Sequence, residues 1–127
     1  GERLKSRKVI EQLFKAGESF AIYPLRLVFI KNEAPLSQYP IQFTVSVSKK
    51  RFKKAVDRNR IKRQIREAWR LNKASIYEAL ADQEAQYAFM IIYTAKEHMP
   101  FSKIERSMVK INKKFLKKRA DTAPKTN

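Results

Sequence analysis

The most restrictive feature of this sequence is a strict alternation of apolar and polar residues from Ile41 to Ser48. A period of two predicts a β-strand, because successive side chains of a strand point to opposite faces of its sheet. The apolar face would carry Ile41, Phe43, Val45 and Val47, and the polar face Gln42, Thr44, Ser46 and Ser48. The chain must therefore build a sheet with one face against a core and a second face that stays available.

Other stretches predict the elements that complete this sheet. Apolar residues at helical spacing predict helices over about 6–16 and 54–72 and from 102 onward, with a short one over 75–82. Apolar runs predict strands over 24–31 and 87–94, and the second is apolar on both faces, as a central strand should be. Gly17 suits the position after the first helix, and Ser102 with Glu105 has the pattern of a capping box.

The element order α, β, β, α, β, α predicts the α/β (α+β) class. We expect a single-domain α/β sandwich around a mixed sheet of about four strands. The domain should span 1–119, and residues 120–127 should form a flexible tail because no apolar period remains there.

The charge of the chain indicates its class of partner. It has 29 Lys and Arg residues against 12 Asp and Glu residues, a formal net charge of +17. So large an excess repels itself in a folded domain, so we expect it to meet a polyanion. The chain has no cysteine and one histidine, His98, which excludes disulfides, thiolate metal sites, histidine-pair metal sites and most catalytic triads.

No segment of the sequence has the pattern of a membrane span or of an export signal. The longest apolar stretch, Tyr87 to Tyr93, is far below the roughly 18 residues that a span requires. The N-terminus lacks the charged and apolar regions of a signal peptide. We therefore expect a cytoplasmic protein without a membrane partner.

The basic residues are concentrated in two stretches, 49–73 and 103–119. On a helical wheel of 58–73, the apolar residues Ile61, Ile65, Ala68 and Trp69 form one stripe. Beside it lies what we term the cationic arc, spread over roughly 140°. The arc consists of Arg58, Asn59, Lys62, Arg63, Arg66, Arg70 and Lys73. Arg60 falls outside the arc, near Gln64 and Glu67.

The cationic arc could be an ordinary solvated helix face, but such faces mix signs, since like charges four residues apart destabilise a helix. Here Arg58, Lys62, Arg66 and Arg70 form an unbroken row of like pairs. A helix lying on a membrane would need a wider apolar face. Arginine takes phosphate oxygens two at a time, and Asn59 can bond a base edge or a 2′-hydroxyl, so the pattern favours nucleic-acid recognition.

At these residues the sequence resembles a known family. Ser46-Val47-Ser48-Lys49-Lys50 followed by Ala55-Val56-Asp57-Arg58-Asn59-Arg60-Ile61-Lys62-Arg63 resembles the protein component of bacterial ribonuclease P. The Arg-Asn-Arg element in this context is that family's signature. The resemblance extends from the Leu4 region to the last basic helix.

This resemblance implies a sandwich with a left-handed crossover, similar to a domain of ribosomal protein S5. It implies a protein that assists a catalytic RNA subunit in removing the 5′ leader from precursor tRNA. The RNA subunit would carry the chemistry with its own magnesium ions, and the sequence assigns no cofactor to the protein itself. The protein would hold the leader in a cleft between the N-terminal helix and the sheet, and would contact the RNA subunit through the signature helix.

The resemblance also implies roles for individual residues. Those that match the leader cleft are Arg58, Asn59, Arg63, Arg66 and Phe14, with Ser46 and Ser48 on the polar strand face. Those expected to contact the RNA subunit are Arg60 and Lys62, with Lys49, Lys50 and Arg70. Two positions depart from the family pattern, because Ile10 and Val28 stand where aromatic residues are common. Tyr23, Phe20 or Phe52 could supply the missing rings.

Two other functions remain open from the sequence. A structural RNA-binding protein of the ribosome would have a similar charge and fold. An autonomous nuclease would need a carboxylate cluster for metal ions or a histidine base. The carboxylates in the basic helix are Asp57 and Glu67, which are ten residues apart, and the single histidine is His98. DNA binding is disfavoured because no helix-turn-helix pattern occurs.

Overall fold

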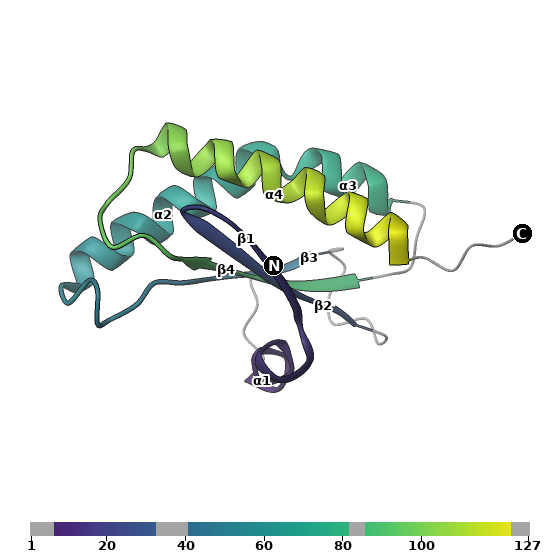
Figure 1. The fold of residues 1–127 in the computed structure, drawn as a ribbon, viewed down its shortest axis with the longest axis horizontal. Coiled ribbons are helices and arrows are strands. Elements are labelled where there is room, and N and C mark those ends of the chain that lie inside the picture. Colours follow the sequence, from purple (N-terminus) through teal and green to yellow (C-terminus); the bar gives the residue numbers. More distant parts are fainter. Residues whose placement is uncertain (1–6, 33–40, 82–85, 123–127) are drawn as a thin grey trace, which may run out of the picture.

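The computed structural model describes residues 7–32, 41–81 and 86–122, and it has a four-stranded sheet between helices (Figure 1). In chain order the elements are α1 (Arg7–Ala16), β1 (Glu18–Ile22), β2 (Leu25–Asn32), β3 (Ile41–Ser46), α2 (Ala55–Asn72), α3 (Ala74–Leu80), β4 (Gln86–Tyr93) and α4 (Phe101–Thr122). Helices α2, α3 and α4 lie on one side of the sheet and α1 on the other. The predicted α+β sandwich is confirmed.

The strand order is β1-β2-β4-β3, with β3 parallel to β4 and the other two pairs antiparallel. A parallel pair needs a crossover connection, which α2 and α3 provide. The sheet is therefore mixed, as expected, with β4 in its interior and β3 at an open edge. Strand β1 was not indicated by the sequence pattern, because only Phe20 among its residues is buried.

The main core lies between the sheet and helices α2, α3 and α4. Ile41, Phe43 and Val45 of β3 point into it, as the alternation predicts. The α2 stripe of Ile61, Ile65, Ala68 and Trp69 is buried against them. The opposite, polar face of β3 is less exposed than the sequence predicts. Gln42 is buried, and Thr44 and Ser46 are half-buried rather than exposed.

A smaller core lies under α1 on the other face of the sheet. Leu13 packs there against Val28, Ala88 and Met90, with Ile10 partly buried beside them. Gly17 ends α1 without a positive φ, so a left-handed cap is not its role. An added Cβ would lie 2.4 Å from the Leu13 carbonyl oxygen and 2.9 Å from Val28 Cγ1. A glycine is required because a side chain would collide with the last turn of α1 itself and with Val28 of β2.

The capping-box prediction for α4 is wrong. The helix begins at Phe101, and the Pro100 carbonyl accepts hydrogen bonds from the amides of Lys103 and Ile104 at 3.0 and 3.3 Å. The Glu105 carboxylate instead accepts a hydrogen bond from α2. At its other end α4 extends to Thr122, three residues into the expected tail, and 123–127 lie outside the described residues.

Candidate nucleic-acid interface

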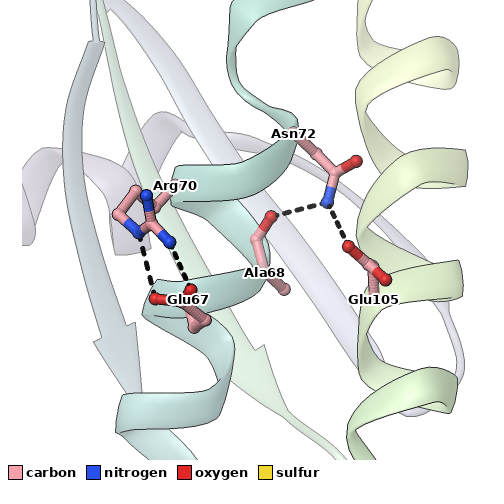
Figure 2. A network of polar contacts seen from close by, with 5 residues as sticks. All are labelled: Glu67, Ala68, Arg70, Asn72 and Glu105. Atoms are coloured by element: carbon pink, nitrogen blue, oxygen red, sulfur yellow. Dashed lines mark hydrogen bonds and ion pairs between the residues drawn. The ribbon is translucent and has the colours of Figure 1, made fainter.

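Two side-chain hydrogen bonds connect one flank of α2 to α4 and to the loop that precedes α4. His98 Nε2 donates a hydrogen bond to Gln64 Oε1 at 2.6 Å. Asn72 Nδ2 donates to Glu105 Oε2 at 3.1 Å and to the Ala68 carbonyl at 2.8 Å (Figure 2). The flank that carries these residues therefore faces α4.

The other flank of α2 faces the open edge of the sheet. Trp69 lies on this side and stacks on Phe43 of β3, with ring centroids 4.7 Å apart. On the helical wheel the cationic arc begins at this flank and continues outward. Asn59, Arg63 and Arg66 of the arc are exposed. The exposed part of the arc therefore lies on the outer side of α2, on the flank nearer to β3 than to α4.

Arg58 belongs to the same arc but is engaged with the protein. Its Nη1 donates hydrogen bonds to the carbonyls of Phe52 and Lys53 at 2.8 and 3.0 Å. The side chain therefore fastens the basic loop of 47–54 to the first turn of α2. Its role in the structure is at least partly to hold this loop, which the residue pattern did not indicate.

Two further contacts hold the basic loop. Arg51 Nη1 donates to the Thr94 carbonyl at 2.5 Å, and the Arg51 amide donates to Ser48 Oγ at 3.4 Å. Ser48 follows the end of β3 and thus belongs to the loop rather than to the strand. Lys49 and Lys50 are exposed on this braced loop. Sequence reasoning missed Arg51, because its partner is 43 positions away in the chain.

The residues expected to contact the RNA subunit do not share one surface. Arg60 is exposed on the outer side of α2, about 160° around the helix from half-buried Lys62. Arg70 forms a two-bond ion pair with Glu67 (Figure 2). This pairing lowers the pKa of the Glu67 carboxyl and raises the pKa of Arg70. The Arg70 guanidinium is therefore occupied by a neighbouring side chain in this structure.

The aromatic candidates lie in three different environments. Phe14 on α1 is 67% exposed and belongs to neither core. Phe20 is buried with the Lys114 ammonium 4.9 Å from its ring centroid, and Phe52 packs on Tyr93. Tyr23 is exposed in the turn between β1 and β2. Of these four aromatic residues, only Phe14 is both exposed and part of α1, the helix on the side of the sheet opposite α2, α3 and α4.

The acid–base candidates are separated from one another. Glu67 is paired with Arg70, His98 with Gln64, and Asp57 is exposed in the first turn of α2. Within 7–32, 41–81 and 86–122, no three His, Cys, Asp or Glu side chains form a group that could hold a metal ion. In the same ranges no helix is long and apolar enough to cross a membrane.

Comparison with known proteins gives a consistent result. The family model named Ribonuclease P matches residues 1–116. The ribonuclease P protein component of Porphyromonas gingivalis is 41% identical over 111 residues, covering 86% of this chain and 79% of the relative. That of Clostridioides difficile is 32% identical over 114 residues, covering 87% and 89%.

Solved structures agree with this result. The RNase P protein from Thermotoga maritima matches with a TM-score of 0.68 at 25% identity, over 90% of this chain and 97% of that one. The Staphylococcus aureus RNase P protein matches with a TM-score of 0.62 at 22% identity, over 92% and 96%, and shows the same fold.

Proposed function

This chain belongs to the ribonuclease P protein family, and from that premise we propose that it binds the 5′ leader of precursor tRNA and the catalytic RNA subunit of ribonuclease P. The observation that supports a leader site most strongly is the position of the cationic arc. Asn59, Arg63 and Arg66 are exposed on the outer side of α2, on the flank nearer to the edge strand β3 than to α4.

The rigidity of α2 makes this surface suited to a flexible strand. Ile61 and Ile65 below the arc are fully buried, and Trp69 is stacked on β3, so the helix has a fixed orientation. Arginine forks on such a support lose little freedom when they bind phosphate oxygens. The half-buried hydroxyls of Thr44 and Ser46 can add hydrogen bonds to sugar or phosphate groups.

Phe14 provides a complementary contact. Its ring is largely exposed, and an unpaired base can stack on such a ring without sequence preference. Ile10 and Val28 lie in the core under α1, so the positions where relatives often have aromatic residues serve packing here. We therefore assign stacking of leader bases to Phe14 alone on this face.

Contacts with the RNA subunit are assigned to residues outside the exposed arc. Lys49 and Lys50 on the braced loop and Arg60 on the outer side of α2 point away from the leader surface in our proposal. Separate sides of one helix would allow the protein to hold both RNAs at once. Half-buried Lys62 would add to this contact. Arg70 would join it only if its guanidinium exchanged Glu67 for a phosphate.

The hydrolysis itself is assigned to the RNA subunit and its magnesium ions. Glu67 and His98 support this assignment, because each is engaged by another side chain of the protein. The protein would act by binding: it would raise the affinity for precursor over mature tRNA and would neutralise phosphate charge.

Reconstitution with the RNA subunit tests this function. Processing of precursor tRNA at low magnesium should become faster when the protein is added. If the protein instead cleaved RNA alone, and His98→Ala or Glu67→Ala abolished that cleavage, the chemistry would be its own. Co-purification with ribosomal subunits rather than with the ribonuclease P RNA would favour a structural ribosomal role.

A further inference from the structure

A second cationic surface covers the outward side of α4. By helical spacing its members share one face, and all are exposed: Lys103, Arg106, Lys110, Lys113, Lys114 and Lys117. No acidic residue lies among them, and Arg106, Lys110 and Lys114 repeat the like-charge spacing of the cationic arc. We call this set the α4 ridge. The same argument that favours polyanion binding by α2 therefore applies to α4.

The α4 ridge and the cationic arc lie on neighbouring helices, but towards opposite edges of the sheet. Helices α2 and α4 pack against each other, but α4 also contacts β1 and β2 whereas α2 also contacts β3, and β1 and β3 are opposite edges of the sheet. Three strand spacings separate these edges, on the order of 14 Å. A ligand of the α4 ridge is therefore held at a different place from a leader on the arc.

One end of the α4 ridge borders a hollow of about 170 Å³. Its lining combines three cations with an aromatic ring and an apolar side: Ile22, Tyr23, Lys103, Arg106, Ser107 and Lys110. Tyr23 is 64% exposed, so its ring is not used up by packing. Ligand pockets for drug-sized molecules usually measure about 300–1,000 Å³, so this hollow suits a smaller group.

The turn that carries Tyr23 is held on both sides. Ser107 is 2% exposed, and its hydroxyl donates a hydrogen bond to the Ile22 carbonyl at 2.5 Å. The Thr94 amide donates to the Pro24 carbonyl at 2.8 Å. These bonds fix the backbone before and after Tyr23 against α4 and β4. The backbone that carries Tyr23 therefore has a fixed position relative to the helix that carries the three cations.

We propose that this hollow binds one unpaired RNA nucleotide, with its base on the Tyr23 ring and its phosphate between Lys103, Arg106 and Lys110. Stacking on an aromatic ring next to a positively charged groove is the usual chemistry of single-stranded nucleic-acid binding. An acidic peptide or an anionic membrane would use the cations but would not need a base-sized contact with the ring. The nucleotide can belong to the RNA subunit or to precursor tRNA, since both present unpaired bases.

A binding experiment on the full chain separates stacking from charge. The probes are a short oligouridylate and an abasic ribose-phosphate strand of the same length. Tyr23→Leu should weaken oligouridylate binding roughly 5- to 150-fold and leave the abasic strand unaffected. Tyr23→Phe keeps the ring and should bind as the original does. Equal affinity of Tyr23→Leu and the original chain for oligouridylate would overturn the proposal.

The cations are tested with a matched pair on the same helix. Arg106→Gln should weaken binding of both probes and reduce the salt slope of oligouridylate binding by about 0.7. Lys113→Gln removes the same charge from the α4 ridge without touching the hollow, and should have less than half that effect. Equal losses in both variants would mean a diffuse basic surface and would contradict a pocket.

Photo-crosslinking locates the ligand and its source. The oligouridylate with 5-iodouridine should crosslink to the peptide that contains Tyr23. In the reconstituted complex, iodouridine is placed either in the RNA subunit or in precursor tRNA, and the strand that labels Tyr23 is the natural ligand. Crosslinks confined to α1, β3 and α2 would overturn the proposal. A Tyr23 crosslink with processing that is insensitive to Arg63→Ala would instead contradict only the leader site.

Discussion

Trp69 of α2 stacks face to face on Phe43 of β3, with an interplanar angle of 4° between the rings. This contact sets the rotation of α2 about its own axis. On the opposite flank, the hydrogen bond from His98 to Gln64 sets the same rotation from the side of α4. Because the helix is fixed from both sides, the exposed residues of the cationic arc keep their place on its outer side, on the flank nearer to β3.

Replacement of Trp69 should separate packing from hydrogen bonding. Trp69→Ala should lower the free energy of unfolding by about 3–5 kcal/mol, because it leaves a cavity between α2 and β3. Trp69→Phe should cost less than about 1.5 kcal/mol, since the buried indole N–H has no partner among the described residues. Denaturant unfolding measures both. Similar losses for the two variants would contradict the assignment of the stability to ring packing.

Arg63→Ala should weaken binding of precursor tRNA roughly tenfold and leave mature tRNA almost unchanged. The reason is that Arg63 is exposed at the leader surface and contacts only the leader phosphates in the proposed complex. Binding at several salt concentrations provides a second readout. A grip on about six leader phosphates gives a log–log slope near −4, and the variant should reduce its size by about 0.7.

Arg60→Ala is the matched control for this experiment, because it removes the same charge from the outer side of the same helix. It should not change the ratio of precursor to mature tRNA affinity. If both variants changed that ratio equally, the proposed side of α2 for the leader would be incorrect.

Arg58→Met should loosen the basic loop. It removes the hydrogen bonds to the carbonyls of Phe52 and Lys53 while keeping most of the side-chain stem. We expect a loss of about 1–3 kcal/mol in stability and faster amide hydrogen exchange over the loop. The amide hydrogen exchange rates of β4 should be unchanged, because the Arg58 side chain donates these hydrogen bonds to the loop and not to this strand. Unchanged exchange of the loop amides would show that Arg58 does not hold them.

Tyr93 should contribute a pH-dependent part of the stability. Burial raises the pKa of its phenol above the usual value, although a hydrogen bond from the Met99 amide acts in the opposite direction. The neutral phenol is therefore favoured in the folded chain. Its contribution is complete below the unfolded value of about 10 and is lost as the pH rises through the higher folded value.

Tyr93→Phe tests this contribution. It should cost about 1–3 kcal/mol near neutral pH, because the Glu97 carbonyl and the Met99 amide lose their partner. As the pH rises above about 10, the original chain should lose stability faster than the variant. Thermal unfolding at a series of pH values measures the difference, and parallel curves would contradict it.

The elements that could be predicted were those with a local period. The alternation from Ile41 to Val47 and the apolar stripe from Ile61 to Trp69 determined a strand and a helix, because each pattern repeats within a few residues. Strand β1 could not be found this way, since its pairing with β2 rather than its own residues makes it a strand. Glu105 failed as a cap for a related reason: Asn72 is a partner from another helix.

The candidate site shows the same division. Sequence alone identified the exposed Asn59, Arg63 and Arg66 as one face, and the spacing of Glu67 and Arg70 already permitted their ion pair. It could not indicate that Arg58 turns back to hold the loop before α2. That contact depends on where the loop backbone lies, which no periodicity describes.

By itself, then, the sequence determined which residues share a face of each element and that one face of α2 is cationic. Only the tertiary structure decided that this face lies on the flank of α2 nearer to β3, and that Tyr23 and Arg106 line one hollow near the opposite edge. The physical reason is that a face follows from the fixed geometry of one helix or strand. Its direction follows from packing and hydrogen bonds between segments that are far apart in the chain.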